Sequence, residues 1–202
     1  MRKYFPPLPD GQKYNFSELN EKLQWEVQWA IEESMLSVDR TLLLPVVIDI
    51  FGEPVPLHDN TYTHFACLHN DIAFIEWLHE RGYELDCLNK VSGLCEDTPL
   101  TISITYNRLE IIKYLLEKGA DPLARQDDGK TALQFAYDEF NYEMTEFFAT
   151  PEAILYPVSD ETMDSFDWMD KESPMNMLDL AIAENRLKYI DLFKSVLKSN
   201  EV

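Results

Sequence analysis

The sequence predicts an all-α fold built from stacked helix-turn-helix units, and three observations lead to this class. Thr98 and Thr131 stand 33 positions apart, and the sequence after each begins in the same way. Two short apolar runs at helical spacing follow Thr98. A helix-ending asparagine or glycine comes after each run. Units of this kind cannot bury their apolar faces alone, so neighbouring units are expected to stack.

Each element of the best-formed unit has a local cause. The hydroxyl of Thr98 and the proline after it suit the first turn of a helix. Asn107 tolerates the left-handed conformation that ends this helix. A second helix is expected from Leu109 to Gly119, where glycine ends it. Residues 126–130 have the aspartates and glycine of a tight hairpin loop.

The segments T-P-L, L-L-E-K-G-A-D-P and D-G-K-T-A-L within residues 98–133 together closely resemble the ankyrin repeat. Residues 61–66 resemble its T-x-x-H-x-A opening even better, which implies a structural role for His64. The resemblance implies an ankyrin-repeat solenoid with short hairpin loops, helical caps and a concave binding face. It implies binding to a protein but names no partner, because a fold does not fix a function.

We expect one structural domain with two parts. Residues 1–60 are predicted to form an N-terminal arm and a helical capping pair, and residues 61–202 the repeats. The predicted segments of the second part are 61–97, 98–130, 131–150, an acidic insertion at 151–172 and a degenerate capping repeat at 173–202. Whether residues 17–52 are themselves a degenerate repeat is left open.

The capping pair is expected to begin at Ser17, which would cap the first helix. Trp25 and Trp29 are four positions apart and should share one face, where we expect them to form a packing stripe. The second helix should start after residues 37–39, and Pro45 must distort it if it is continuous.

Two departures from the 33-residue pattern are expected to matter. The unit that begins at residue 61 carries four extra residues, which we place in the loop at 89–95. In the unit after Thr131, Phe140 stands where the other units have asparagine, and Asn141 follows one position late. The second helix of this unit is expected at about residues 142–148 and to end at Thr150-Pro151 without the Gly-Ala-Asp closure, so the sequence predicts a change of register there.

The charge is the strongest compositional feature, with 37 acidic against 17 basic residues and a formal net charge of −20. Direct binding to nucleic acid or to an anionic membrane is disfavoured, because both draw on basic patches. The charge would speed association with a basic partner protein. It would equally serve solubility alone.

We expect a cytoplasmic protein that is monomeric when free. The sequence has no apolar run long enough to span a membrane and no apolar secretory signal at its start. The three cysteines, Cys67, Cys87 and Cys95, are an odd number without a C-x-x-C pair. They are expected to be small apolar residues in a reducing compartment.

The sequence predicts no enzyme and no cofactor or metal, because it lacks the common catalytic and phosphate-binding motifs. A zinc site of His69, His79 and Cys87 is disfavoured, since the spacing fits no ligand pattern. A hydrolase that uses Asp138 and Asp160 was disfavoured likewise, because turns and helix surfaces supply such carboxylates everywhere.

The resemblance places the concave face at the hairpin tips and at the last residues of each first helix. There, aromatic side chains would anchor a partner while carboxylates pair with guanidinium groups. The predicted partner-binding residues are His69, Asp97, Tyr106, Asp128, Lys130, Asp138, Glu139, Asp167, Trp168 and Glu184. For the aromatic residues of the acidic insertion, packing onto the third repeat is an equally open alternative.

These observations favour a protein-interaction module that binds and neutralises a basic partner, such as a toxin or nuclease. The chain would then be an immunity-type or antitoxin-type inhibitor. The alternative is a secreted effector or a regulatory adaptor that holds a host or cellular protein with the same repeats.

Overall fold

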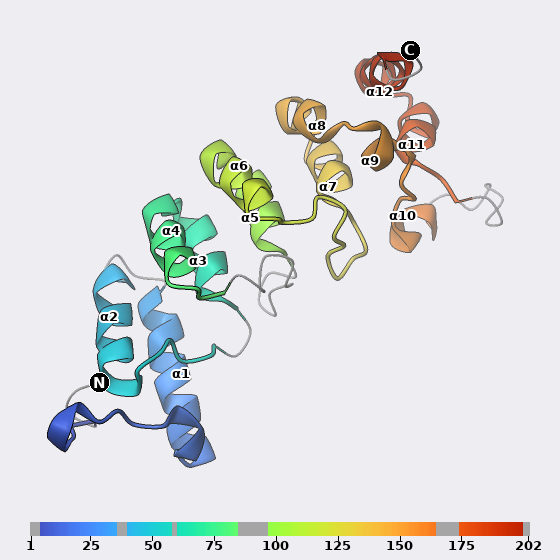
Figure 1. Ribbon diagram of the computed structural model, residues 1–202. Helices are drawn as coiled ribbons and strands as arrows, with labels where there is room; N and C mark the ends of the chain where they lie inside the picture. The colour runs from blue at the N-terminus through green and yellow to red at the C-terminus, as the bar shows by residue number, and fades with distance from the viewer. Residues whose placement is uncertain (1–4, 36–39, 58–59, 85–96, 165–173, 200–202) are drawn as a thin grey trace. The chain divides into compact units, whose positions relative to one another are not determined.

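A computed structural model describes residues 5–35, 40–57, 60–84, 97–164 and 174–199 (Figure 1). Within these ranges the regular structure is helical, apart from one isolated bridge between Pro157 and Asn176. The predicted all-α class is confirmed. The loop at 89–95, the start signal at 37–39, Cys87 and Cys95 lie outside the described residues.

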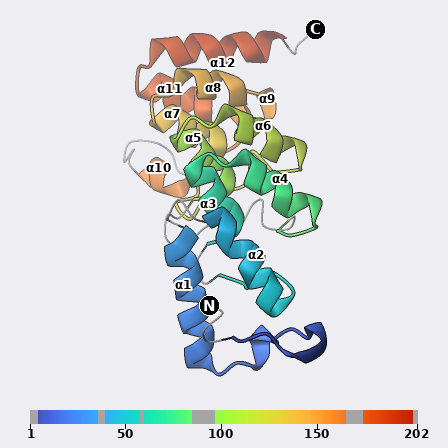
Figure 2. The same cartoon turned by 90° about the vertical axis from the view of Figure 1, so that its left-hand side faces the viewer.

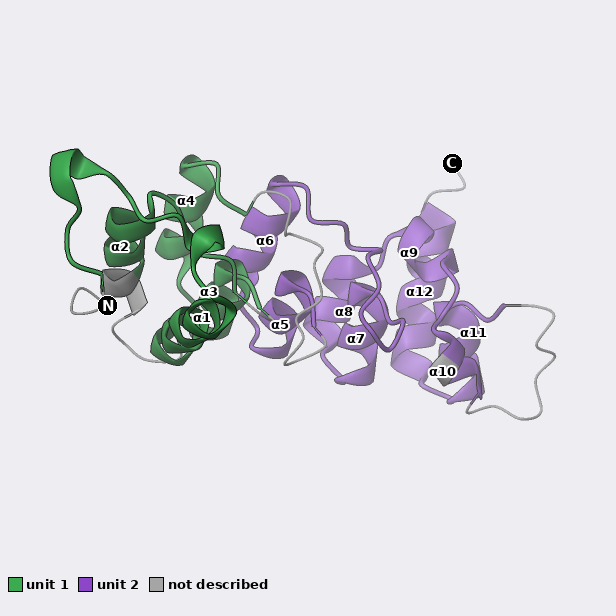
Figure 3. Ribbon diagram, turned by 90° about the horizontal axis from the view of Figure 1, so that it is seen from below, with its two compact units in different colours: residues 1–87, 92–94 green, residues 88–91, 95–202 purple. Residues whose placement is uncertain are grey.

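The chain divides into two compact units (Figure 3). Unit 1 comprises residues 1–87 and 92–94, and unit 2 comprises residues 88–91 and 95–202. The first predicted repeat therefore shares a unit with the N-terminal helices, and the later repeats share the other. The predicted division after residue 60 stays a prediction.

Unit 1 contains two short 3-10 turns and two helical pairs, in which α1 contacts α2 and α3 contacts α4. Its elements are η1 (Pro9–Gly11), η2 (Phe16–Glu18), α1 (Glu21–Met35), α2 (Arg40–Phe51), α3 (Tyr62–His69) and α4 (Ile72–Glu80). Helix α2 is continuous through Pro45, which is one of the two possibilities that the sequence left open.

Helix α1 begins one turn later than predicted, so Ser17 is not its cap. Asn20 takes that place, because its Oδ1 accepts a hydrogen bond from the amide of Leu23 at 3.0 Å. The hydroxyl of Ser17 instead donates to Oδ1 of Asn15 at 2.8 Å, within the η2 turn. Both residue types are good caps, and this local bond decides between them.

Trp25 and Trp29 share a face of α1, as predicted, but they do not form a packing stripe. Their rings stack on each other with centroids 5.5 Å apart, and about half of each side chain is exposed, 52% and 54%. The buried face of α1 is made by Val27, Ile31 and Met35 instead. The stacked pair is a surface feature of unit 1.

The first repeat, α3 and α4, starts with a reciprocal cap. The amide of His64 donates to the hydroxyl of Thr61 at 3.3 Å, and the amide of Thr61 donates to Nδ1 of His64 at 3.1 Å. The imidazole is buried. Asn70 ends the helix in the left-handed conformation, with φ 58°. The predicted structural role of His64 is confirmed.

A second cap for α3 comes from Glu84, in the loop after α4. Its carboxylate accepts from the backbone amides of Tyr62 at 2.9 Å and of Thr63 at 2.8 Å. Burial raises the pKa of the Glu84 carboxyl, while these hydrogen bonds act in the opposite direction. The negative charge lies at the N-terminus of the helix, where the helix dipole favours it.

Unit 2 is built from helical pairs around one continuous core. Its helices are α5 (Pro99–Thr105), α6 (Leu109–Glu117), α7 (Ala132–Asp138), α8 (Tyr142–Phe148), α9 (Pro151–Leu155), α10 (Asp160–Asp164), α11 (Met177–Ala183) and α12 (Leu187–Ser199). Figure 2 shows the pairs in successive layers from α5 to α12. This arrangement confirms the stacked helix-turn-helix units.

The first helices of unit 2 all end in the same way. Asn107, Phe140 and Asn185 adopt the left-handed conformation, with φ of 53°, 55° and 54°. The substitution of phenylalanine for asparagine therefore does not disturb the turn, because Phe140 itself takes the position that asparagine holds elsewhere. Asn141 begins the next helix, since its Oδ1 accepts from the amide of Met144 at 3.2 Å.

The described part of the predicted insertion begins as a capped helix. The hydroxyl of Thr150 accepts from the amide of Ala153 at 3.2 Å, and proline fills the first helical position. The Thr-Pro pair thus repeats the start seen at Thr98. Ala153 and Ile154 are buried in the core of unit 2, so α9 belongs to the packed fold.

Buried polar contacts fasten the segment that follows α9. The side chain of Gln134 accepts from the amide of Ser159 at 3.1 Å and donates to the hydroxyl of Thr162 at 2.7 Å. The Arg125 guanidinium donates to the carbonyl of Pro157 at 2.9 Å. Two long polar side chains, Arg125 of the second repeat and Gln134 of the third, therefore hold residues 157–162 in place.

Candidate protein-binding face

The predicted partner-binding residues fall in different parts of the structure. His69 is the last residue of α3 in unit 1 and is half-buried. Seven others belong to unit 2, and they are Asp97, Tyr106, Asp128, Lys130, Asp138, Glu139 and Glu184. Asp167 and Trp168 lie outside the described residues.

The ends of the first helices hold the central members of this set. Tyr106 follows the last residue of α5, Asp138 is the last residue of α7, and Glu184 follows α11. Each lies one or two residues before the left-handed turn residue of its unit. The repeat register therefore brings one side chain from each first helix to the same edge of unit 2.

Lys130 joins the hairpin loop to the end of α7. Its ammonium lies 3.1 Å from a carboxylate oxygen of Asp128 and 3.3 Å from one of Asp138. Burial opposes the charge of Lys130, but the hydrogen bond to Asp128 and the charge of Asp138 outweigh it and raise its pKa. The charge of Lys130 is therefore already paired with two other predicted residues, Asp128 and Asp138.

Glu184 ties the end of α11 to the end of α7. The hydroxyl of Tyr137 donates to Oε2 of Glu184 at 2.7 Å, and Nε of Arg186 lies 2.7 Å from the same oxygen. Arg186 also donates through Nη1 to the carbonyl of Tyr137 at 2.9 Å. Three side chains from two repeats thus form one bonded cluster.

The two clusters interact electrostatically through Asp138. Burial raises the pKa of the Asp138 carboxyl, the Lys130 ammonium lowers it, and the negative charge of Glu184 raises it further. The pKa of Asp138 is raised overall, because burial and the charge of Glu184 outweigh the nearby cations. Burial and the hydrogen bond to Glu184 also raise the pKa of Tyr137 well above its usual range. A further cation near Asp138 would favour its ionised form.

Exposed aromatic rings border these carboxylates. Phe140 is 70% exposed and Tyr106 is 47% exposed. The Arg186 guanidinium lies 4.2 Å from the centroid of the Phe140 ring, and that of Arg108 lies 5.7 Å from Tyr106. We call the surface made by Tyr106, Asp138, Phe140, Glu184 and Leu187 the acidic-aromatic face. Leu187 adds an apolar side chain that is 67% exposed.

Sequence reasoning missed Phe140 and Arg186 as members of this face. A signal existed for the arginine, because the triplet Asn-Arg-Leu occurs at 107–109 and again at 185–187. In both places the arginine after the turn asparagine lies over an aromatic ring. For Phe140 the signal was its place at the asparagine position, which indicates an exposed ring at the turn and not a degraded repeat.

Chemistry other than binding finds little support in the part of the chain that the structure describes. Within it, no cluster of three or more histidine, cysteine, aspartate or glutamate side chains could hold a metal ion. Cys67 is buried, as expected for a core residue. Over the same ranges, no helix has both the length and the apolar character needed to cross a bilayer.

Repeated helical hairpins, reciprocal threonine caps and left-handed turn residues define a class of stacked-repeat proteins that bind through exposed edges. A family model described as ankyrin repeats in three copies matches residues 63–156. This part of the chain consists of ankyrin repeats. The match continues beyond Thr150, so it includes α9, which follows the third repeat.

The curated relatives are much longer than this chain. SMC5-SMC6 complex localization factor protein 1 of Bos taurus is 29% identical over 140 residues, which are 68% of this chain and 12% of that protein. E3 ubiquitin-protein ligase hecd-1 of Caenorhabditis elegans is 27% identical over 96 residues, 46% of this chain and 3% of the relative. The chain thus corresponds to a small fraction of either protein.

Among solved structures, the ankyrin repeat domain of Bcl-3, a member of the IkappaB family, is similar at 23% identity with a TM-score of 0.40. The similarity covers 45% of this chain and 38% of that structure.

Proposed function

We propose that this ankyrin-repeat module binds a basic partner protein through the acidic-aromatic face and neutralises it, as an immunity or antitoxin protein would. Ankyrin repeats are protein-protein interaction modules, which supports the general function. The observation that carries the specific proposal is the convergence of Asp138 and Glu184 beside the exposed ring of Phe140. We also propose that the chain acts in the cytoplasm and as a monomer when free.

Arg186 illustrates the recognition chemistry. Its guanidinium stacks on Phe140 and pairs with Glu184, which is how this surface would treat an arginine from a partner. Asp138 would receive the partner's cation, because burial and Glu184 leave its ionised form under-compensated. Tyr106 and Leu187 would contribute apolar contact area around that ion pair.

The net charge of −20 supports the same class of partner. A strongly acidic chain attracts a basic protein over distances of about 10 Å at moderate salt and speeds the encounter. Contacts at the face would then decide how long the complex lasts. An inhibitor benefits from both properties.

The test is capture of partners from the native cells, followed by measurement with the purified partner. We expect a basic protein whose Kd rises at least tenfold when Asp138→Asn is combined with Phe140→Ala. The wild-type chain should suppress the partner's own activity at a one-to-one ratio. Raising the salt from low to physiological concentration should weaken the complex.

The matched control is Glu117→Gln, which removes one exposed carboxylate from the last turn of α6, away from the first-helix ends. It should leave the Kd within twofold of the parent. The proposal fails if no basic partner is captured, or if the control and the double variant weaken binding equally. Binding without suppression of the partner's activity would instead favour an adaptor.

A further inference from the structure

An open groove runs along unit 1 between α2 and α4, on the side of the second helix of the repeat. It consists of two adjoining cavities of about 200 Å³ and about 460 Å³. Pro45 of α2 and Trp77 of α4 line both cavities, so the two lie next to each other. We call this feature the α2–α4 groove.

The floor of the groove is apolar and fixed by the core. The ring of Trp77 stacks on that of Phe74, with centroids 6.2 Å apart and an interplanar angle of 9°. Phe74 is only 6% exposed, so it holds the indole against the packed interior. Pro45 forms the facing wall and has no backbone N–H to donate. An apolar side chain could pack on this floor without displacing a polar group.

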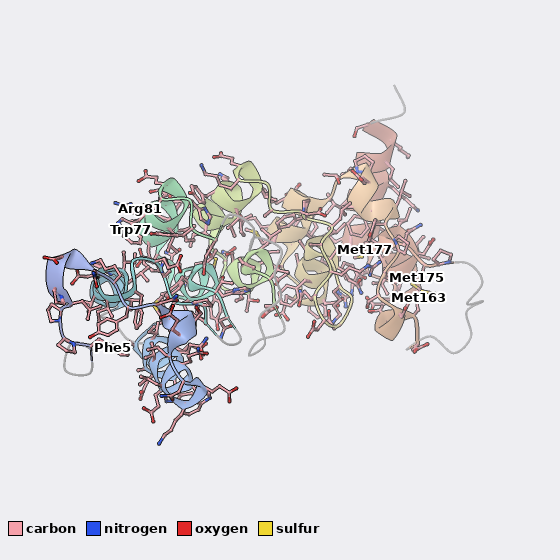
Figure 4. All side chains as sticks on the ribbon, turned by 60° about the horizontal axis from the view of Figure 1, so that its bottom comes forward. Phe5, Trp77, Arg81, Met163, Met175 and Met177 are labelled. Carbon is pink, nitrogen blue, oxygen red and sulfur yellow. The ribbon has the colours of Figure 1, made fainter. Side chains whose placement is uncertain are left out.

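Arg81 places a positive charge at one end of the floor. Its guanidinium lies 4.3 Å from the centroid of the Trp77 ring, and Nη1 donates to the Trp77 carbonyl at 3.0 Å (Figure 4). One of its five N–H donors is thereby used. Within the described ranges, no acidic side chain pairs with Arg81.

The other charges along the groove have roles within unit 1. Asp49 pairs with Lys13 at 3.2 Å. Asp71 caps α4, where its carboxylate accepts from the amide of Phe74 at 3.2 Å. Arg81 is therefore the charge best able to receive a ligand, and a carboxylate matches its planar fork.

We propose that the α2–α4 groove binds an extended segment of another protein in which an apolar side chain is followed by aspartate or glutamate. The apolar side chain would lie on Trp77, and the carboxylate would pair with Arg81. The smaller cavity is below the range of about 300–1,000 Å³ typical of enclosed small-molecule sites. Its open continuation suits a chain segment better than a compact ligand. This site goes beyond the proposed function, because it lies on other helices than the acidic-aromatic face and binds an acidic segment where that face binds a basic one.

The test uses the full chain labelled with ¹⁵N and two short peptides as probes. Acetyl-Leu-Phe-Asp-Glu-amide is the acidic probe, and acetyl-Leu-Phe-Lys-Lys-amide is the charge-reversed control. We expect saturable shifts of the Trp77 indole N–H and the Arg81 Nε–H with the acidic peptide alone. The whole chain carries −20, so unspecific attraction would favour the basic peptide and cannot imitate this result.

Arg81→Gln should raise the Kd of the acidic peptide at least fivefold while the melting temperature falls by no more than about 2 °C, because Arg81 is exposed. Trp29→Gln changes the exposed Trp25–Trp29 pair on α1, outside the groove, and should leave the Kd of the acidic peptide unchanged. Equal binding of the two peptides at Trp77 would overturn the proposal, as would unchanged binding to Arg81→Gln. Self-association of the free chain that Arg81→Gln abolishes would assign the groove to a second copy and would overturn it too.

Discussion

The α2–α4 groove and the acidic-aromatic face use the same local contact and reach opposite charge preferences. In the groove the Arg81 guanidinium lies 4.3 Å from the centroid of Trp77, and in the face that of Arg186 lies 4.2 Å from Phe140. Arg186 is also paired with Glu184, whereas no described acidic side chain pairs with Arg81. A stacked guanidinium thus leaves a surface cationic or anionic according to the carboxylates beside it.

The largest expected effect is on stability, and it compares the packing of the Trp77 ring with that of the Trp29 ring. Trp77→Ala removes a half-buried ring from its packing on Phe74 and should lower the free energy of unfolding by about 2 kcal/mol. Trp29→Ala, at an exposed ring, should cost less than about 0.5 kcal/mol. Urea unfolding measures both, and similar losses would show that the groove floor is not anchored by the core.

The second prediction separates the two arginines. Arg186→Gln leaves Glu184 and the Tyr137 carbonyl without one partner each and should cost about 1–2 kcal/mol. Arg81→Gln loses an exposed stacking contact and an exposed hydrogen bond to the Trp77 carbonyl, together worth about 0.5 kcal/mol. Thermal melts of the two variants at the same pH test this difference. If Arg81→Gln proves as costly, Arg81 has a structural role and the comparison fails.

The third prediction uses the left-handed turn at Phe140. A bulky residue in this conformation loses about 1–2 kcal/mol of stability, and the loss is smaller for asparagine. Phe140→Asn should therefore stabilise unit 2 by about 0.5 kcal/mol, even after the contact with Arg186 is lost. Denaturant midpoints measure the gain. The same variant should bind the basic partner more weakly, so a gain in both stability and affinity would contradict the role given to the ring.

The smallest expected effect is a pH dependence confined to the face. The folded pKa of Asp138 is raised, so its stabilising contribution is complete below its unfolded pKa of about 3.9 and is lost as the pH rises through the folded value. The stability of Asp138→Asn relative to the parent should therefore increase by a few tenths of a kcal/mol from about pH 4 to about pH 7. Arg81→Gln should show no such trend, because guanidinium does not titrate there. Urea unfolding of both proteins at several pH values tests this trend. If the relative stability of Asp138→Asn falls as the pH rises, the pKa of Asp138 is lowered by folding and the prediction is wrong.

The repeat register could be predicted from sequence because its signals are local. The caps at Thr61 and Thr98 and the turn at Asn107 involve residues three or four positions apart, and all are confirmed. Ser17 failed because the chain offered two suitable caps within one turn. Phe140 failed because stacking on neighbouring repeats imposes a conformation that its own preference would not select.

Other features lie beyond local reasoning because they join distant positions. Glu84 caps a helix that begins 22 residues earlier, and its spacing matches no known motif. The α2–α4 groove exists only once two helices from different pairs lie side by side. For the face, the repeat pattern could place Asp138 and Glu184 at equivalent edges. It could not reveal that Lys130 and Arg186 already pair with them.

The polar fastening around Ser159 has a consequence for engineering. The amide of Val158 donates to the carbonyl of Met175 at 2.9 Å, and Gln134 holds Ser159, so the positions between Val158 and Met175 are bounded by one fixed base. The entropy cost of a closed loop grows only with the logarithm of its length, by about 0.6 kcal/mol for each doubling. A foreign peptide could therefore be inserted there at little cost, which makes this ankyrin module a scaffold for displaying a chosen sequence.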